Sequence, residues 1–193
     1  KQLNEKRADW ENQFAALKNE REFPLIDKKI ITPWNALTVS GLLNAYGAFS
    51  DDSFLKQAKQ TFTFIEDHLI RRKKLMHTFQ ANEAKMEANL EDYAFTIKAA
   101  LDLYQNTGGQ AYLDRAVQLT QTAIKNFEND ENPFFTFTEN PVLFSEIISV
   151  DDNVIPSANA IMAENLWALG QLIENEDYTT KAKKMLDGVV SYF

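Results

Sequence analysis

The chain has 193 residues and a formal net charge of −8. No basic stripe is available to displace counterions from a polyanion, so this charge balance excludes nucleic acid as a partner. Cysteine is absent, which excludes disulfides, thiolate catalysis and cysteine-bound zinc. No apolar run approaches the roughly 20 residues of a membrane span, and the first 20 residues are too charged for a signal peptide. We therefore expect no membrane insertion and a cytoplasmic location.

A repeat of helical hairpins organises the chain. Three segments begin on an aromatic residue and carry an alanine four positions later, and they start at Phe54, Tyr112 and Tyr178. The starts are 58 and 66 residues apart, which is longer than tetratricopeptide or HEAT repeats. A spacing near 60 residues fits an inner helix, a short turn, an outer helix and a long return loop. The six glycines and five prolines are few for this length and favour such long helices.

Apolar periodicity sets the predicted helices in chain order. The first covers residues 3–18 and is predicted to be the outer helix of a preceding hairpin, because Leu3, Trp10, Phe14 and Leu17 share one face. Three hairpins follow. Their inner helices are predicted over 33–49, 90–106 and 157–173, and their outer helices over 52–72, 110–127 and 177–193.

Helix starts carry recognisable capping signals. Thr32 is predicted to cap the first inner helix, with Pro33 in the first turn, where its missing N–H costs nothing. Asn89 is predicted to cap the second inner helix, ahead of Glu91 and Asp92, whose negative charges favour the positive end of a helix.

Two return loops, residues 74–88 and 129–156, are much longer than the turns. The alternation of Phe135, Thr136, Phe137 and Thr138 is typical of a strand, and we predict short β-ribbons in these loops, over the mouth of the fold. The fold class is therefore all-α, a partial α/α toroid of about three hairpins. We predict one domain over residues 1–193, truncated from a longer protein because neither end carries a terminating signal.

The same register places polar clusters together. The clusters begin 21 residues before each outer-helix aromatic residue, at Pro33, Glu91 and Ser157. Inner helices of a closed toroid run parallel, so their N-termini converge on one end of the central cavity, where the long loops also arrive. We predict Glu91, Asp92 and Asp152 as candidate catalytic acids there. The predicted substrate-binding residues are Asp27, Trp34, Asn35, His77, Tyr93, Ser157 and Asn159.

This mixture of residues suits a sugar. Carboxylates beside apolar rings can have their pKa values pushed apart, which yields one acid and one base. Aromatic rings such as Trp34 and Tyr93 match the apolar faces of a sugar, and Asn35 and Asn159 match its hydroxyl edges. The competing interpretation is structural, because Asp, Asn and Ser are common helix caps and aromatic residues are common in cores. Two histidines without paired acids do not make a metal site, and no cofactor is predicted.

The motifs at these clusters resemble those of the YyaL-type family of thioredoxin-domain-containing proteins, also called the spermatogenesis-associated protein 20 family. The similar stretches are Asp27–Asn35, Leu90–Phe95, Tyr112–Ala116 and Asp152–Asn159, in the family's order and spacing. The resemblance implies the family's C-terminal six-hairpin toroid, similar to N-acylglucosamine 2-epimerases and related glycosidases. It also implies a thioredoxin-like domain elsewhere in the parent chain.

Two functions are open at this point. The first is a carbohydrate-active or sugar-binding toroid, with glycosidase- or epimerase-like acid–base chemistry if it is an enzyme. It expects two or more of the candidate acids to face one cavity. The second is a scaffold that docks the thioredoxin-like domain or another protein, and it expects Phe134, Phe135 and Phe137 to form an exposed patch. We also expect an incomplete ring to self-associate through exposed helix faces.

Overall fold

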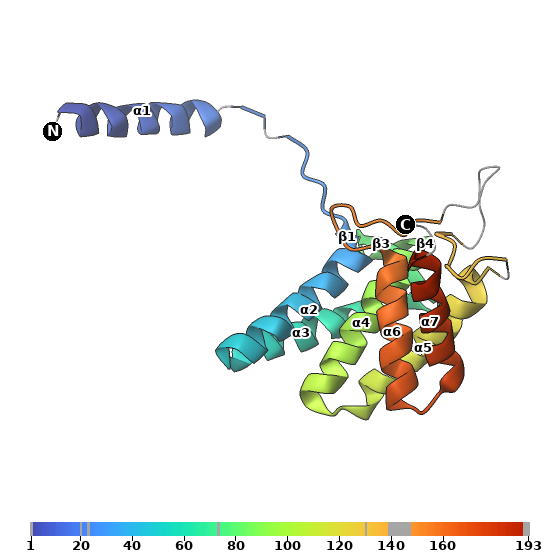
Figure 1. Cartoon of the computed structure of the whole chain (residues 1–193). Coiled ribbons are helices and arrows are strands. Elements are labelled where there is room, and N and C mark those ends of the chain that lie inside the picture. The colour runs from blue at the N-terminus through green and yellow to red at the C-terminus, as the bar shows by residue number, and fades with distance from the viewer. Residues whose placement is uncertain are drawn as a thin grey trace.

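A computed structural model describes residues 2–19, 21–22, 24–72, 74–129, 131–138 and 148–190. Three helical hairpins stand side by side in the part described (Figure 1). Their inner helices are α2 (Thr32–Phe49), α4 (Leu90–Thr107) and α6 (Ala158–Leu172). Their outer helices are α3 (Asp52–Phe64), α5 (Gln110–Phe127) and α7 (Glu176–Val190). The all-α hairpin architecture predicted from the repeat is confirmed.

Among the three hairpins, the central one supplies the largest share of the core. Helix α4 packs against α2, α5 and α6, and its residues Phe95, Ile97 and Leu103 are fully buried. The side-chain amide of Asn165 on α6 donates to the Ala94 carbonyl over 2.8 Å, a buried polar tie between the two inner helices. The hydroxyl of Thr120 on α5 is buried and has no hydrogen-bond partner.

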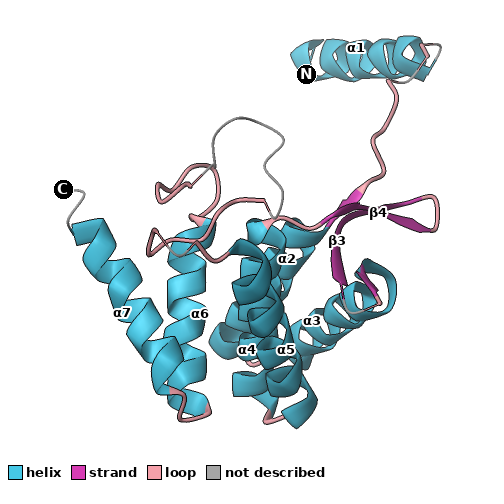
Figure 2. Cartoon of the chain, turned by 90° about the vertical axis from the view of Figure 1, so that its right-hand side faces the viewer, coloured by secondary structure: helices cyan, strands magenta, loops and turns pink. Residues whose placement is uncertain are grey.

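Short turns close the hairpins at the opposite end from the long loops (Figure 2). Asp51 caps α3 by accepting a hydrogen bond from the Ser53 N–H over 2.8 Å. Gly170 lets α6 and α7 approach closely, because a Cβ added there would lie 2.5 Å from the Thr179 methyl carbon and 3.0 Å from backbone atoms. A larger residue would separate the two helices.

The first return loop forms the β-ribbon predicted for it. Strand β3 (Lys74–Gln80) pairs antiparallel with β4 (Glu83–Glu87), β1 (Ile30–Ile31) and β2 (Ile70–Arg71). The second ribbon is not formed in the described residues of its loop, 129, 131–138 and 148–156. Thr136 donates instead to the Phe127 carbonyl and Phe137 accepts from the Leu90 N–H, so this segment bonds to helix ends rather than to a strand.

Two details of the helix ends differ from the prediction. Helix α3 stops at Phe64 and continues as a π-helical turn over Ile65–Leu69, because the chain bends there into β2 while keeping its apolar side chains buried. Thr32 does not cap α2. Its hydroxyl donates to the Met76 carbonyl over 2.6 Å, which ties the helix start to the sheet.

Helix α1 (Gln2–Asn19) forms where a helix was predicted, but it extends away from the hairpins (Figure 1). Its apolar face is not buried by the rest of the described chain, and Trp10 and Phe14 are 57% and 70% exposed. None of the helices described has the length and apolar content that crossing a membrane requires.

Candidate functional site

All three inner helices begin at the same end of the molecule, beside the sheet and the long loops (Figure 1). The start of α4 is fixed by a capping box. Asn89 accepts a hydrogen bond from the Asp92 N–H over 3.3 Å, and Asp92 accepts one from the Asn89 N–H over 2.8 Å. This exchange satisfies two N–H groups that a helix start would otherwise leave free, and it holds Glu91 and Asp92 in the first turn.

Strand β3 brings His77 to the same place. Successive side chains of a strand point to opposite faces, so His77 shares its face with the buried Leu75 and Phe79. That face covers the start of α4, and His77 Nδ1 lies 3.0 Å from both carboxyl oxygens of Asp92. The carboxyl group of Asp92 has no exposed surface, whereas 23% of the His77 side chain is exposed.

Burial and charge perturb three ionisable groups here. Burial raises the pKa of Asp92, although the hydrogen bond from His77 opposes this shift. That same hydrogen bond, to Asp92, raises the pKa of His77. Burial raises the pKa of the half-buried Glu91, and the neighbouring charge of Asp92 adds to the shift. Perturbed pKa values of this kind gather at functional sites, and they also arise in structural ion-pair networks.

Glu91 lines a cavity of about 250 Å³ between the starts of α4 and α6. Phe137 and Ile155 contribute apolar wall, and Asp151 and Ser157 contribute polar groups. Of the three candidate acids, Glu91 alone lines this cavity. Asp152 lines a neighbouring cavity of about 460 Å³, and its carboxylate accepts a hydrogen bond from the Ser157 N–H over 2.8 Å.

Ser157 and Asn159 hold the second return loop at this opening. The Asn159 side chain accepts from the Phe135 N–H over 2.8 Å and donates to the Phe135 and Ser149 carbonyls. The Ser157 hydroxyl donates to the same Ser149 carbonyl over 3.2 Å. Both residues touch the Glu91 cavity, and both are bonded to the backbone that shapes it.

The other predicted binding residues, including His77, do not line the Glu91 cavity. The Trp34 ring is 61% exposed, and the Asn35 amide donates to the Ile31 carbonyl beside a separate cavity. Asp27 pairs with Lys29, whose backbone and side-chain hydrogen bonds lower the pKa of this exposed carboxyl. Tyr93 is 2% exposed and packs edge-on against Phe127, so its ring has no free face and the predicted stacking role does not fit.

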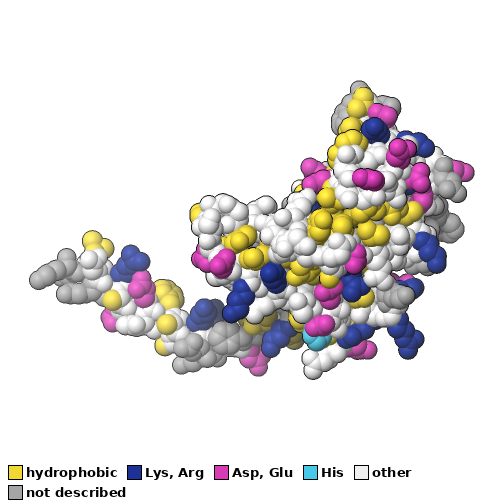
Figure 3. All heavy atoms as spheres, turned by 90° about the horizontal axis from the view of Figure 1, so that it is seen from below, with side chains coloured by type: hydrophobic (Ala, Val, Ile, Leu, Met, Phe, Trp, Pro, Cys, Tyr) yellow, Lys and Arg dark blue, Asp and Glu magenta, His cyan; other side chains and the backbone are white. Residues whose placement is uncertain are grey.

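The surface expected for a docking scaffold is not exposed. Phe134 is 7% and Phe135 is 1% exposed, and Phe137 is partly buried beside Glu91, because the loop folds back over the helix ends. Exposed apolar side chains lie instead on the flank of α6 and α7, where Trp167 and Leu186 border a shallow cavity. From the end that carries the short turns, hydrophobic side chains are visible as a patch between charged ones (Figure 3).

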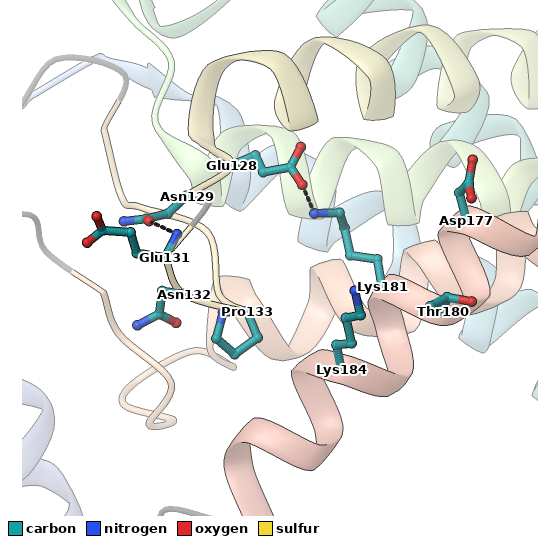
Figure 4. A pocket seen from close by; sticks show the side chains of 9 residues that line it. All are labelled: Glu128, Asn129, Glu131, Asn132, Pro133, Asp177, Thr180, Lys181 and Lys184. Atoms are coloured by element: carbon teal, nitrogen blue, oxygen red, sulfur yellow. Dashed lines mark hydrogen bonds and ion pairs between the residues drawn. The ribbon is translucent and has the colours of Figure 1, made fainter.

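Sequence reasoning missed a cavity of about 540 Å³, which lies between the end of α5, the following loop and α7. Lys181 points across it to Glu128, with which it forms an ion pair (Figure 4). The opening has both charge signs on its walls. Sequence reasoning also missed Asp151 in the Glu91 cavity, although it precedes Asp152 in the same acidic turn. Within the described ranges, His, Asp and Glu side chains form no group of three that could hold a metal.

The three inner helices, each packed against an outer helix and against its neighbours, have the hairpin architecture of an α/α toroid. The α-mannanase of glycoside hydrolase family 76 from Bacteroides thetaiotaomicron superposes with a TM-score of 0.68 at 18% identity, over 90% of this chain and 46% of that one. Cellobiose 2-epimerase from Bacillus thermoamylovorans gives 0.68 at 18% identity, over 83% and 44%. An inactive α-1,6-mannanase variant from Salegentibacter, solved with α-1,6-mannotriose, gives 0.67 at 14% identity, over 90% and 50%. Identities this low establish the fold alone.

Homologues of the chain are the spermatogenesis-associated protein 20 proteins, as the motif resemblance predicts. The human protein is 28% identical over 189 residues, which are 91% of this chain and 24% of that protein. An uncharacterised protein of Caenorhabditis elegans, B0495.5, is 30% identical over 180 residues, or 89% of this chain and 25% of that protein. The chain thus spans about a quarter of the length of these relatives. No protein-family model matches the sequence.

Proposed function

We propose that this domain binds a carbohydrate at the N-terminal end of its inner helices, with Glu91 as the carboxyl group that contacts the sugar. The observation that carries the proposal is the placement of Glu91, half-buried in a cavity with an apolar wall and several polar groups. Such a lining suits a sugar ring, which has apolar faces and hydroxyl edges. The volume of about 250 Å³ is just below the range of about 300–1,000 Å³ typical of small-molecule sites, and it favours a single ring over a long oligosaccharide.

The structural neighbours support this substrate class. They include mannanases and a cellobiose epimerase, and the Salegentibacter enzyme was inactivated by replacing two aspartates at adjacent positions. Glu91 and Asp92 are likewise an adjacent acidic pair, at the start of an inner helix. A carboxyl group whose pKa is raised stays protonated at a higher pH than usual and can act as a general acid. We therefore assign Glu91 the acid role if the domain is catalytic.

Calorimetry tests the proposal. The chain is titrated with D-mannose, cellobiose and α-1,6-mannotriose, and we expect saturable heat with at least one of them. Glu91→Gln should weaken that binding by about two- to tenfold, because a hydrogen bond between neutral groups contributes roughly 0.5–1.5 kcal/mol. The matched control is Glu176→Gln, which alters an exposed carboxyl at the start of α7, at the opposite end of the hairpins. Equal binding by wild type and Glu91→Gln would refute the role of Glu91.

A further inference from the structure

Two acidic residues line the Glu91 cavity, and they come from different parts of the chain. Glu91 lies in the first turn of α4, and Asp151 belongs to the loop that precedes α6. Neither carboxyl group has a hydrogen-bond or ion-pair partner among the described residues. In that same part of the chain, no Lys, Arg or His lines the cavity. The wall therefore carries negative charge with no positive side chain to balance it.

Positive side chains on the neighbouring elements are already paired with other acids. The imidazole of His77 lies 3.0 Å from the carboxyl group of Asp92. Further along α4, the ammonium group of Lys98 donates to Glu164 over 2.8 Å and lies 3.5 Å from Asp102. Each of these positive groups has its own acidic partner, so they do not neutralise the acids of the cavity wall.

The positive ends of α4 and α6 also lie at this cavity, and a helix start favours an anion. Acidic side chains already occupy both ends. Asp92 accepts a hydrogen bond from the Asn89 N–H over 2.8 Å, and Asp152 accepts one from the Ser157 N–H over 2.8 Å. The two acids that line the cavity are therefore additional to those that balance the helix ends.

The pKa of Glu91 agrees with a shortage of positive charge. Burial raises this pKa and the charge of Asp92 raises it further, while attraction from His77 offsets only part of the shift. A positive group on a ligand would stabilise the ionised carboxyl, whereas a phosphate or carboxylate on a ligand would be repelled by it. The charge of the wall thus disfavours acidic sugars and favours a cationic one.

We infer that the ligand of this cavity is an amino sugar, which places its protonated ammonium group against Glu91 and Asp151. The inference rests on the proposed function and deepens it by naming the substrate class. Ionised carboxyl groups only accept hydrogen bonds, and an ammonium group only donates them. The apolar wall at Phe137 and Ile155 is left for the face of the sugar ring.

Calorimetry at pH 6.5 tests the inference with matched pairs of sugars. D-mannosamine is compared with D-mannose, and D-glucosamine with D-glucose, so that an ammonium group replaces one hydroxyl in each pair. We expect the amino sugar of at least one pair to bind about fivefold or more tightly, the factor that a single exposed ion pair can supply. N-acetylation removes the charge and should abolish this preference. Raising NaCl from about 50 mM to about 500 mM should reduce it.

Two variants connect the preference to the cavity wall. Glu91→Gln and Asp151→Asn should each lower the ratio of affinities within a pair, because each removes one negative charge next to the ammonium group. Asp151 is exposed and Glu91 lies outside the capping box, and circular dichroism checks that both variants fold. The control Glu176→Gln should leave the ratio unchanged. A ratio that neither cavity variant lowers would overturn the inference, since the net charge of −8 would then attract the amine without this site.

The same titrations separate failure of the inference from failure of the proposed function. Saturable heat with neutral sugars and equal affinities within each pair would overturn the inference and leave the proposed function standing. No heat with any sugar, neutral or amino, would refute the proposed function and the inference with it. Ethanolamine carries the same charge without the ring. If it binds as tightly as the amino sugars, the cavity recognises a cation alone and the inference is wrong.

Discussion

Replacing His77 by glutamine removes the imidazole that contacts both oxygens of the buried Asp92. A hydrogen bond to a charged group contributes about 1.5–3 kcal/mol, and the wild-type pair is sheltered enough for this range to apply. We therefore expect His77→Gln to lower the free energy of unfolding by about 1.5–3 kcal/mol at pH 6.

The loss should depend on pH. His77 has its pKa raised above its ordinary value by the hydrogen bond to Asp92. A base whose pKa is raised on folding stabilises the fold fully below its unfolded pKa of about 6.5 and loses that contribution as pH rises through the folded pKa. The difference between wild type and His77→Gln should therefore be largest at pH 6 and shrink towards pH 9.

Urea unfolding followed by circular dichroism at pH steps from 6 to 9 measures this difference. The control is His68→Gln, which separates the loss of an imidazole ring packed on Phe64 and Phe79 from the loss of this hydrogen bond. A difference that stays constant or grows with pH would refute the reasoning, because it would mean that the imidazolium form of His77 is not the one that the fold stabilises.

Three further predictions concern packing. Gly170→Ala should cost about 1–3 kcal/mol of unfolding free energy, since the new Cβ would overlap Thr179, whereas Gly41→Ala, with open space around it in α2, should stabilise by up to about 1 kcal/mol. Thr120→Val should raise the melting temperature, because it removes a buried hydroxyl that has no partner, and scanning calorimetry measures this variant and the two glycine variants. We also propose that the chain self-associates through the exposed flank of α6 and α7; Leu186→Lys should then shift sedimentation towards monomer, and equal sedimentation would count against this surface.

The hairpins could be predicted from the sequence because each helix carries its own periodicity and its own end signals. Asn89 shows this well, since a single capping residue fixed the start of α4. The end of α3 could not be predicted in the same way. The apolar spacing of Ile65 and Leu69 continues a helical pattern. The bend into β2 comes from pairing with β3, and the periodicity of a single helix carries no information about that pairing.

The environment of the site depended on contacts between distant segments. The scaffold hypothesis expected Phe134 and Phe135 to be exposed, yet the bonds between Asn159 and the Phe135 backbone fold that segment inward. The pairing of His77 with Asp92 had a partial signal in the sequence. Leu75, His77 and Phe79 alternate along one strand face, and this alternation places the imidazole on the buried side of the ribbon.

Helix geometry explains why the side chains of Glu91 and Asp92 lie in different surroundings. Consecutive residues of an α-helix point about 100° apart, so two adjacent carboxyl groups in its first turn leave the helix in different directions. At the start of α4, one direction faces the opening beside α6 and the other faces the underside of β3. The capping box fixes which residue takes which direction, because the third residue of the helix must turn back to the Asn89 N–H. The carboxyl group at position 92 is therefore held inside, against His77 and the Asn89 N–H, and the side chain at position 91 lines the cavity.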